Sequence, residues 1–125
     1  PPVDVEAAIM RDALFEQVLL IGEGKPYLSV IAVLNAENWK KMVTDYRIDA
    51  AAPGALLLTQ VQAIVLERFA HQLREFPGYA QVRRVTLTLE PWTVENGLLT
   101  PTMKLKRAKV LEMFNAELDR MYSGH

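Results

Sequence analysis

The stretch that decides the fold is Phe15–Leu34, which reads FEQVLLIGEGKPYLSVIAVL. It holds two mostly apolar runs, 15–21 and 27–34, and each has the length of an ordinary strand. Gly22–Pro26 lies between them and is a turn by composition, because glycine and proline interrupt regular structure. We therefore predict an antiparallel hairpin. The low polarity of 15–21 further predicts that this first strand is central in its sheet.

A helix is predicted on each side of the hairpin. Pro1 and Pro2 are followed by acidic residues, a combination that suits a first helical turn, and this helix should run to about Arg11. After the second strand, Asn35 can cap a helix over 37–46.

Two longer helices, over 58–75 and 106–121, are predicted from apolar residues at three- and four-residue spacing. Between them, apolar and polar residues alternate over 84–90, which indicates a half-buried strand. The whole predicts a small α+β domain, a sheet of about three strands with helices packed on it. The core-facing sets are Val61, Val65, Phe69, Leu73 and Phe76, then Val85, Leu87 and Leu89 (with Arg84, Thr86 and Thr88 facing away), then Val110, Phe114, Leu118 and Met121.

Composition bounds the class of protein. The 125 residues suit one domain, and a net charge of −1 gives no indication of nucleic-acid binding. The absence of cysteine excludes disulfides, thiolate zinc sites and a cysteine nucleophile, and it fits a reducing cytoplasm. No apolar run reaches the roughly 18 residues that a spanning helix needs. The stretch at Pro1 lacks the basic and apolar regions of a signal peptide and does not begin with Met, so we expect the chain to be part of a longer cytoplasmic protein.

General catalytic patterns are weak. No sequence argument pairs His71 with His125, and we expect both side chains to be solvated or hydrogen-bonded. The acidic residues show no metal-ligand spacing, so no metal site is predicted. Gly22–Gly24 is too short for a dinucleotide-binding loop. Trp39 and Trp92 are expected in the core rather than at an interface.

The segment with chemical character is Gly97–Arg107, which reads GLLTPTMKLKR. Asn96 and Gly97 predict a tight turn, and Lys104, Lys106 and Arg107 place three cations within four residues. A basic, solvated helix start is the simple interpretation, although cations at a helix N-terminus oppose its dipole. An anion-binding role is the competing hypothesis, because local rules often break at functional sites.

This segment resembles the last conserved motif of the adenylate-forming ligases, in the form found in long-chain acyl-CoA synthetases. Other branches of the family carry a Pro-Lys-Thr-x-x-Gly-Lys version. The resemblance also includes Val18–Leu28, which is similar to the family's first hairpin. It extends to Pro1–Glu6, which is similar to the stretch just after the interdomain hinge. Together these segments cover nearly the whole chain in the right order.

The resemblance implies that residues 1–125 are the C-terminal lid domain of a long-chain-fatty-acid–CoA ligase. Such an enzyme converts fatty acid, ATP with Mg²⁺ and coenzyme A to acyl-CoA, AMP and pyrophosphate. Its N-terminal adenylation domain, absent here, would be the lid's partner and would bind ATP and the fatty acid. The lid would rotate about a hinge before Pro1 between adenylation and thioester formation. Alone it would hold no cofactor tightly and be inactive, and contact with the inner face of the membrane would come only through the missing domain.

Residue by residue, the resemblance places the catalytic lysine at Lys106, just before the arginine. Thr102 aligns with the threonine of the Pro-Lys-Thr version, and Thr102 and Lys104 are expected to contact substrate. Lys104 falls where other branches carry a small residue, which makes it the alternative catalytic lysine. Two other functions stay open. The chain could be a non-catalytic binding or regulatory module with the lid fold, or the lid of a ligase with another acyl specificity.

Overall fold

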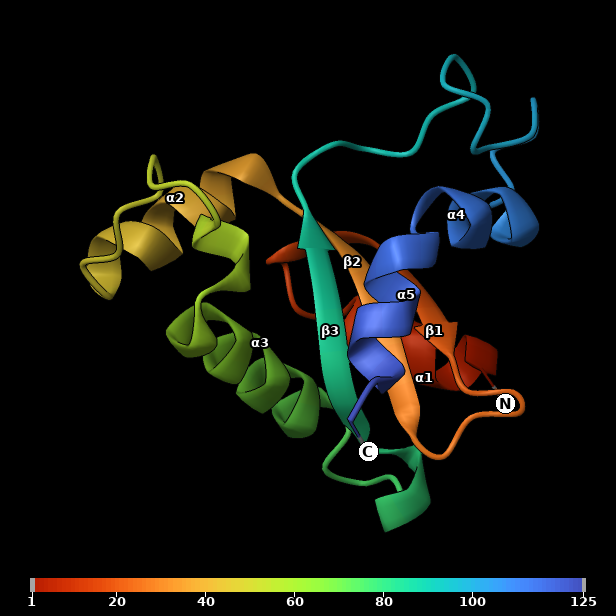
Figure 1. The fold of residues 1–125 in the computed structure, drawn as a ribbon, viewed down its shortest axis with the longest axis horizontal. Helices are drawn as coiled ribbons and strands as arrows, with labels where there is room; N and C mark the ends of the chain where they lie inside the picture. The colour runs from red at the N-terminus through yellow and green to blue at the C-terminus, as the bar shows by residue number, and fades with distance from the viewer. Residues whose placement is uncertain (1, 125) are drawn as a thin grey trace.

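The computed structural model describes residues 2–124, so the predictions for Pro1 and His125 lie outside the described residues. The described chain combines a three-stranded sheet with five α-helices and two short 3-10 helices (Figure 1). The elements are α1 (Pro2–Ile9), β1 (Phe15–Ile21), β2 (Leu28–Leu34), α2 (Ala36–Asp45), η1 (Ala55–Leu57), α3 (Thr59–Gln72), η2 (Gly78–Ala80), β3 (Val82–Thr88), α4 (Arg107–Met113) and α5 (Asn115–Tyr122). The predicted α+β class with about three strands is confirmed.

The sheet has the order β1-β2-β3, with β1 antiparallel and β3 parallel to β2. The predicted hairpin is therefore confirmed, but the prediction that Phe15–Ile21 is central is wrong, because β2 is the central strand. At the free edge of β1, side chains supply some of the hydrogen bonds that a further strand would make. The Leu20 amide donates to the Glu6 carboxylate, and the Gln17 side chain exchanges hydrogen bonds with the main chain of Trp92. The low polarity of this edge strand follows from burial of both its faces, with Phe15 and Val18 in one apolar cluster and Leu19 and Ile21 in another.

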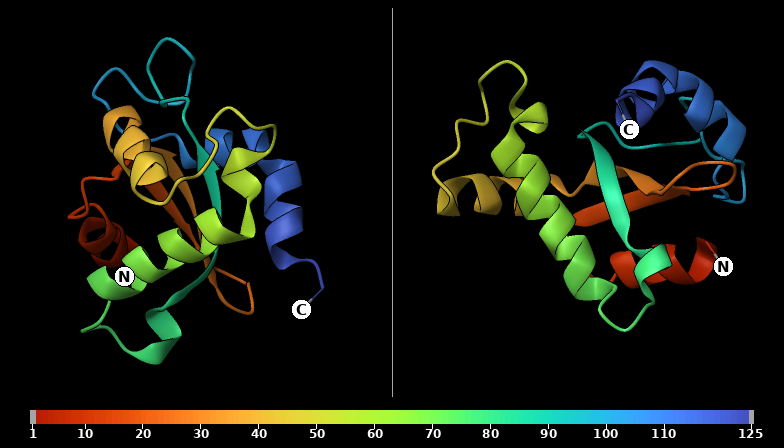
Figure 2. Two further views of the ribbon diagram at one scale, coloured as in Figure 1. Left: turned by 90° about the vertical axis from the view of Figure 1, so that its left-hand side faces the viewer. Right: turned by 60° about the horizontal axis from the view of Figure 1, so that its bottom comes forward.

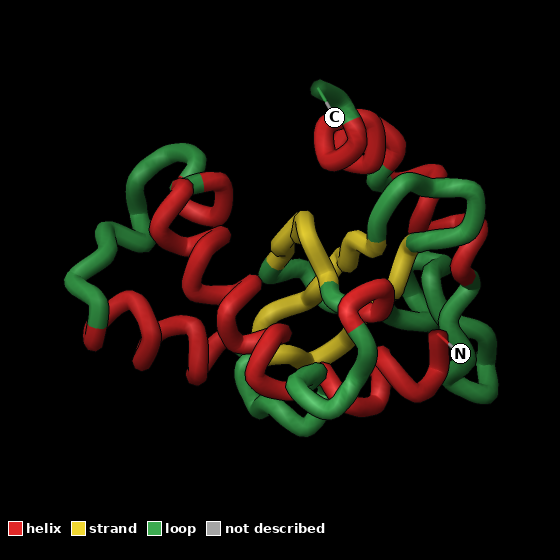
Figure 3. Tube along the Cα trace, turned by 90° about the horizontal axis from the view of Figure 1, so that it is seen from below, coloured by secondary structure: helices red, strands yellow, loops and turns green. Residues whose placement is uncertain are grey.

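Helices cover both faces of the sheet. Figure 2 shows α1 and α3 on one side of the sheet and α4 and α5 on the other. In Figure 3 the C-terminal helix lies on the opposite side of the strands from the N-terminal helix. Each face has its own apolar cluster. The first includes Val30, Ala32 and residues of α1, α2 and α3, whereas the second includes Ile31, Val33, Trp92 and residues of α4 and α5. The core therefore consists of two layers separated by the sheet.

This two-sided cover corrects the prediction for the third strand. Val85 and Leu87 pack in the first cluster as predicted. Thr86, predicted to face away from the core, is buried, because α5 packs on that face of β3. Leu89, predicted to face the core, is 42% exposed, since β3 ends at Thr88 before reaching it.

The long helices follow their apolar stripes, with one exception. Val61, Val65 and Phe69 of α3 are fully buried, and so is Leu73, the residue that caps its C-terminus. Asn35 caps α2 as predicted, accepting a hydrogen bond from the Asn38 amide at 2.9 Å. The single helix predicted over 106–121 is instead two helices that meet at Phe114, whose backbone departs from helical geometry. The bend lets residues of both helices pack against the same face, including Val110, Leu111, Phe114, Leu118 and Met121.

Candidate functional site

The basic segment forms a narrow hairpin between β3 and α4, which we call the motif hairpin (residues 98–106). Leu99 and Leu105 pair in an antiparallel bridge. The Thr100 amide donates to the Lys104 carbonyl at 2.8 Å, and the Lys106 amide donates to the Leu98 carbonyl at 2.9 Å. Figure 1 shows the whole connection as the loop that rises from the end of β3 and returns to α4. The motif therefore has a defined backbone before the helix begins.

The turn that starts this hairpin is the predicted one at Asn96 and Gly97. Gly97 adopts a φ of 80°, a region in which side chains with a Cβ are strained. The Asn96 side-chain oxygen accepts hydrogen bonds from the Thr93 amide at 2.9 Å and the Leu98 amide at 3.3 Å. Asparagine and glycine thus each have a separate role in reversing the chain.

The tip of the hairpin is organised by Thr100, which sequence reasoning missed. Its hydroxyl accepts a hydrogen bond from the Lys104 amide at 3.0 Å and lies 3.1 Å from the Thr102 hydroxyl. Met103, at the tip, has a φ of 67° and is 66% exposed. Threonine near a proline turn often bonds to nearby backbone, and that tendency is the signal that could have identified Thr100.

The two lysines stand on the solvent side of the hairpin. Leu98 and Leu99 are buried and Leu105 is partly buried, and all three pack in the second cluster. Successive side chains of an extended segment point to opposite sides, so the inward Leu105 leaves Lys104 and Lys106 on the solvent side. Thr102, Lys104 and Lys106 are all exposed. The structure thus brings the sequence-predicted site residues together on one short, accessible hairpin.

Arg107 differs from these two lysines because it pairs with an acidic side chain, Glu6. Its guanidinium donates two hydrogen bonds to the Glu6 carboxylate, at 2.9 and 2.7 Å. This hydrogen bonding to Glu6 raises the pKa of Arg107 above its ordinary value, despite the opposing effect of burial. Within residues 2–124, neither Lys104 nor Lys106 forms an ion pair. Of the three neighbouring cations, two remain available to an anionic ligand.

The other sequence candidates lie outside this hairpin. Trp39 and Trp92 are buried, as predicted, while His71 is exposed on α3. Among the described residues no group of three or more histidine, cysteine or acidic side chains could hold a metal ion. In that same part of the chain, no helix combines the length and apolar character needed to cross a membrane.

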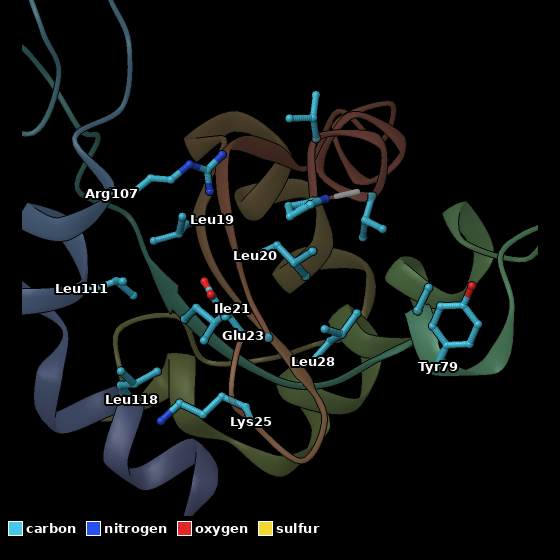
Figure 4. Close-up of a pocket in the computed structure, with 15 residues that line it drawn as sticks. Leu19, Leu20, Ile21, Glu23, Lys25, Leu28, Tyr79, Arg107, Leu111 and Leu118 are labelled. Atoms are coloured by element: carbon cyan, nitrogen blue, oxygen red, sulfur yellow. The ribbon is translucent and has the colours of Figure 1, made fainter.

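A groove of about 940 Å³ runs along β1 between α1 and the α4–α5 pair. Figure 4 shows Leu19, Leu111 and Leu118 on its walls, with Arg107 toward one end and Lys25 toward the other. Its lining is mostly aliphatic, and neither Lys104 nor Lys106 belongs to it. The groove is therefore a less suitable anion site than the motif hairpin.

The chain is similar to known proteins along nearly its whole length. The whole chain, residues 1–125, matches the family model described as the AMP-binding enzyme C-terminal domain. It is 31% identical over 124 residues to a chloroplastic long-chain-fatty-acid–[acyl-carrier-protein] ligase of Arabidopsis thaliana, covering 98% of this chain and 15% of that protein. It is 28% identical over 125 residues to human long-chain-fatty-acid–CoA ligase 1, covering 98% of this chain and 18% of the relative.

A solved structure supports the fold. The adenylation domain of a carboxylate reductase from Mycobacterium chelonae superposes with a TM-score of 0.78 at 24% identity, covering 97% of this chain and 17% of that one. At this identity the likeness concerns architecture alone. The chain spans less than a fifth of the length of the curated relatives described above.

Proposed function

The chain belongs to the family of AMP-binding enzyme C-terminal domains, and from that membership we propose that it is the mobile catalytic lid of a long-chain-fatty-acid–CoA ligase. The observation that carries the proposal is the motif hairpin. It presents Lys106, exposed and without an ion-pair partner within residues 2–124, on a backbone held by hydrogen bonds. An N-terminal adenylation domain is the proposed partner and would bind the ATP–Mg²⁺ and fatty-acid substrates.

The proposed role of Lys106 follows from the charges in the first half-reaction. An oxygen of the fatty carboxylate attacks the α-phosphorus of ATP, the bond from that phosphorus to the bridging oxygen breaks, and pyrophosphate leaves. Two anions must approach each other, and negative charge accumulates on the oxygens around phosphorus. A lysine ammonium placed between them offsets both effects, and a preorganised contact of this kind stabilises the transition state.

In the second half-reaction the acceptor thiol attacks the acyl carbonyl, the bond from that carbon to the phosphate oxygen breaks, and AMP leaves. We propose that the lid rotates between the steps and withdraws Lys106, which makes room for coenzyme A. A long, flexible side chain on a fixed backbone suits this cycle, because the ammonium can enter and leave while the domain moves as a unit.

The backbones of Lys106 and Lys104 are both held by hydrogen bonds, but at different places in the hairpin. Lys106 stands where the hairpin joins α4, with its amide bound to the Leu98 carbonyl and its carbonyl accepting from the Val110 amide. Lys104 follows Met103, the tip residue in the left-handed region, and its amide and carbonyl both bond to Thr100. Because backbone hydrogen bonds hold both lysines, the resemblance to the family motif decides between them, and on that ground we assign the catalytic role to Lys106 and substrate contact to Lys104 and Thr102.

Acyl-carrier protein is a second candidate for the molecule that supplies the acceptor thiol. The plant relative is named as a ligase that transfers to acyl-carrier protein rather than to coenzyme A, and it aligns with nearly all of this chain. The acyl specificity, the cytoplasmic location and the alternative of a non-catalytic module with the lid fold also stay predictions. The experiment below tests the acceptor, the acyl specificity and the non-catalytic alternative by measuring each half-reaction with a chosen substrate.

The test uses the complete protein that carries this chain, with Lys106→Ala, Lys104→Ala and Lys109→Ala compared. Lys109 is a matched control, because it is an exposed lysine on α4 outside the motif hairpin. Lys106→Ala should slow acyl-adenylate formation by roughly 10²–10³-fold, the usual effect of removing one preorganised transition-state contact. Thioester formation from preformed acyl-adenylate should stay near normal, and Lys104→Ala should be far milder.

Adenylation is measured by pyrophosphate release with palmitate and shorter acids, and transfer is measured with coenzyme A and with holo acyl-carrier protein. Strong loss in Lys104→Ala alone would move the role to that lysine. Normal adenylation in both variants would refute the catalytic assignment. A wild-type protein that forms no adenylate with any acid would favour the non-catalytic module.

A further inference from the structure

The Glu6 carboxylate links three elements of the fold through hydrogen bonds. One oxygen accepts hydrogen bonds from the Leu20 amide at 2.8 Å and from Arg107 at 2.9 Å, and the other accepts from Arg107 at 2.7 Å. Glu6 belongs to α1, Leu20 to the free edge of β1, and Arg107 is the first residue of α4. Only 13% of the Glu6 side chain is exposed, against 47% for Arg107.

This arrangement acts directly on the backbone of Lys106, because Arg107 is the next residue. On the N-terminal side, the Lys106 amide is bound to the Leu98 carbonyl at 2.9 Å. On the C-terminal side, the Arg107 side chain attaches the start of α4 to α1 and β1 through Glu6. The Lys106 Cα therefore lies between two attachments, while its side chain stays exposed.

The same pair also separates charges. Without Glu6, Arg107 would be a free cation adjacent to Lys106, able to bind the same anionic groups. A guanidinium binds carboxylates and phosphates in two-pronged geometry, so an unpaired Arg107 would compete with the lysine for substrate. With Glu6 present, the guanidinium is engaged elsewhere.

We propose that Glu6 is a positioning residue for Lys106. Its carboxylate holds Arg107, and thereby the root of the motif hairpin, against α1 and the edge of β1, so that the lysine starts from a fixed point. Glu6 touches no substrate in this scheme. The proposal rests on the proposed function, and its test is chosen so that the two can fail separately.

The chain supplies a matched control. Arg68 donates to Asp12 at 2.7 and 2.8 Å, which is the same two-pronged geometry, and the Asp12 side chain is 9% exposed. That pair joins the segment after α1 to α3, on the face of the sheet opposite the motif hairpin. Removing it should weaken the fold without moving Lys106.

The experiment compares Glu6→Gln, Arg107→Gln and Asp12→Asn in the complete protein. Glu6→Gln keeps an acceptor for the Leu20 amide and removes the charge. Adenylation should slow by about 10- to 100-fold, the scale expected when a catalytic group is displaced by up to about 1 Å. Thioester formation from preformed acyl-adenylate should be unchanged. Arg107→Gln alters the more exposed partner and should likewise slow adenylation while leaving thioester formation unchanged. Asp12→Asn should lower Tm but change the rate of neither half-reaction.

A second arm places Glu6→Gln in the Lys106→Ala background, where no further loss of adenylation is expected, because Glu6 acts through that lysine. The positioning role is overturned, with the proposed function intact, by any of three results. These are normal adenylation in Glu6→Gln and Arg107→Gln, equal slowing of both half-reactions, and a further loss in the Lys106→Ala background. If Lys106→Ala adenylates normally while Lys104→Ala does not, this inference falls and the catalytic role moves to Lys104. If both lysine variants adenylate normally, the catalytic assignment and this inference fall together.

Discussion

Two arginine–carboxylate pairs join residues that are far apart in the chain. Arg107 binds Glu6 across 101 positions, and Arg68 binds Asp12 across 56. Exposed ion pairs contribute little to stability, but both of these carboxylates are largely shielded from solvent. Burial alone would raise the pKa of Asp12, yet hydrogen bonds from Arg68 and the Leu14 amide outweigh it and hold that pKa below its ordinary value.

The lowered pKa of Asp12 predicts how stability depends on pH. A carboxyl whose pKa is lower in the folded state stabilises the fold above its unfolded pKa, near 3.8, and loses that contribution as pH falls through the folded value. Asp12→Asn should therefore be less stable than wild type at pH 7, with the difference shrinking below about pH 4. Urea unfolding at a series of pH values measures this. Arg68→Gln should reduce this pH-dependent contribution, since only the Leu14 amide bond to Asp12 would remain. A stability difference between Asp12→Asn and wild type that stays constant down to pH 2 would contradict the role given to the Asp12 carboxylate.

At the scale of elements, the motif hairpin and its entry turn depend on two residues with positive φ. Its entry turn uses Gly97 in the left-handed region, and its tip uses Met103 in the same region. Its leucines are packed in the second cluster, so the backbone is supported from beneath. The hairpin consequently holds its shape without belonging to the main sheet.

This dependence can be tested at Gly97. Apart from its neighbours in the chain, no heavy atom lies within 4 Å of a Cβ built on Gly97, so Gly97→Ala isolates the cost of its φ of 80°. That cost should be about 1–2 kcal/mol in unfolding free energy. Gly78→Ala is the control, because Gly78 also has open space but no positive φ. It should be neutral or stabilising by about 0.4–1 kcal/mol. If denaturant unfolding gives the same change in unfolding free energy for Gly97→Ala and Gly78→Ala, the positive φ of Gly97 is not the cause of the cost.

At the scale of the whole molecule, the sheet separates two apolar clusters, and both lie within this chain. A domain with its own core on each face of its sheet needs no second domain to cover that sheet. Such a body can turn as a unit about a hinge, which is the motion proposed for a lid. It contains the proposed lysine, whereas binding of ATP and fatty acid is assigned to the partner domain.

We therefore predict that the isolated chain folds and is inactive. Purified residues 1–125 should unfold in one cooperative transition with coincident circular dichroism and fluorescence curves. Incubated with ATP, palmitate and coenzyme A, the chain should form no acyl-CoA. Turnover above a buffer control would contradict the assignment of substrate binding to another domain. A broad, non-cooperative transition would show that the two clusters are insufficient by themselves.

Local patterns were sufficient for much of the fold. The hairpin, the stripe of α3, the Asn35 cap and the turn at Gly97 all depend on residues close in sequence, so periodicity and turn chemistry predicted them. The motif around Lys106 was also visible in the sequence, because its residues are contiguous.

Only the tertiary structure decided which strand is central, which residues of β3 are buried and where the last helix bends. It also decided that Arg107 is bound to Glu6 while Lys106 is left exposed. Each of these outcomes depends on a segment distant in the chain: β3 crossing to the far side of β2, α5 covering Thr86, and α1 bringing a carboxylate to the root of the motif hairpin. Residue type and spacing describe what one segment can do, whereas the partner that it meets is determined by how the whole chain packs.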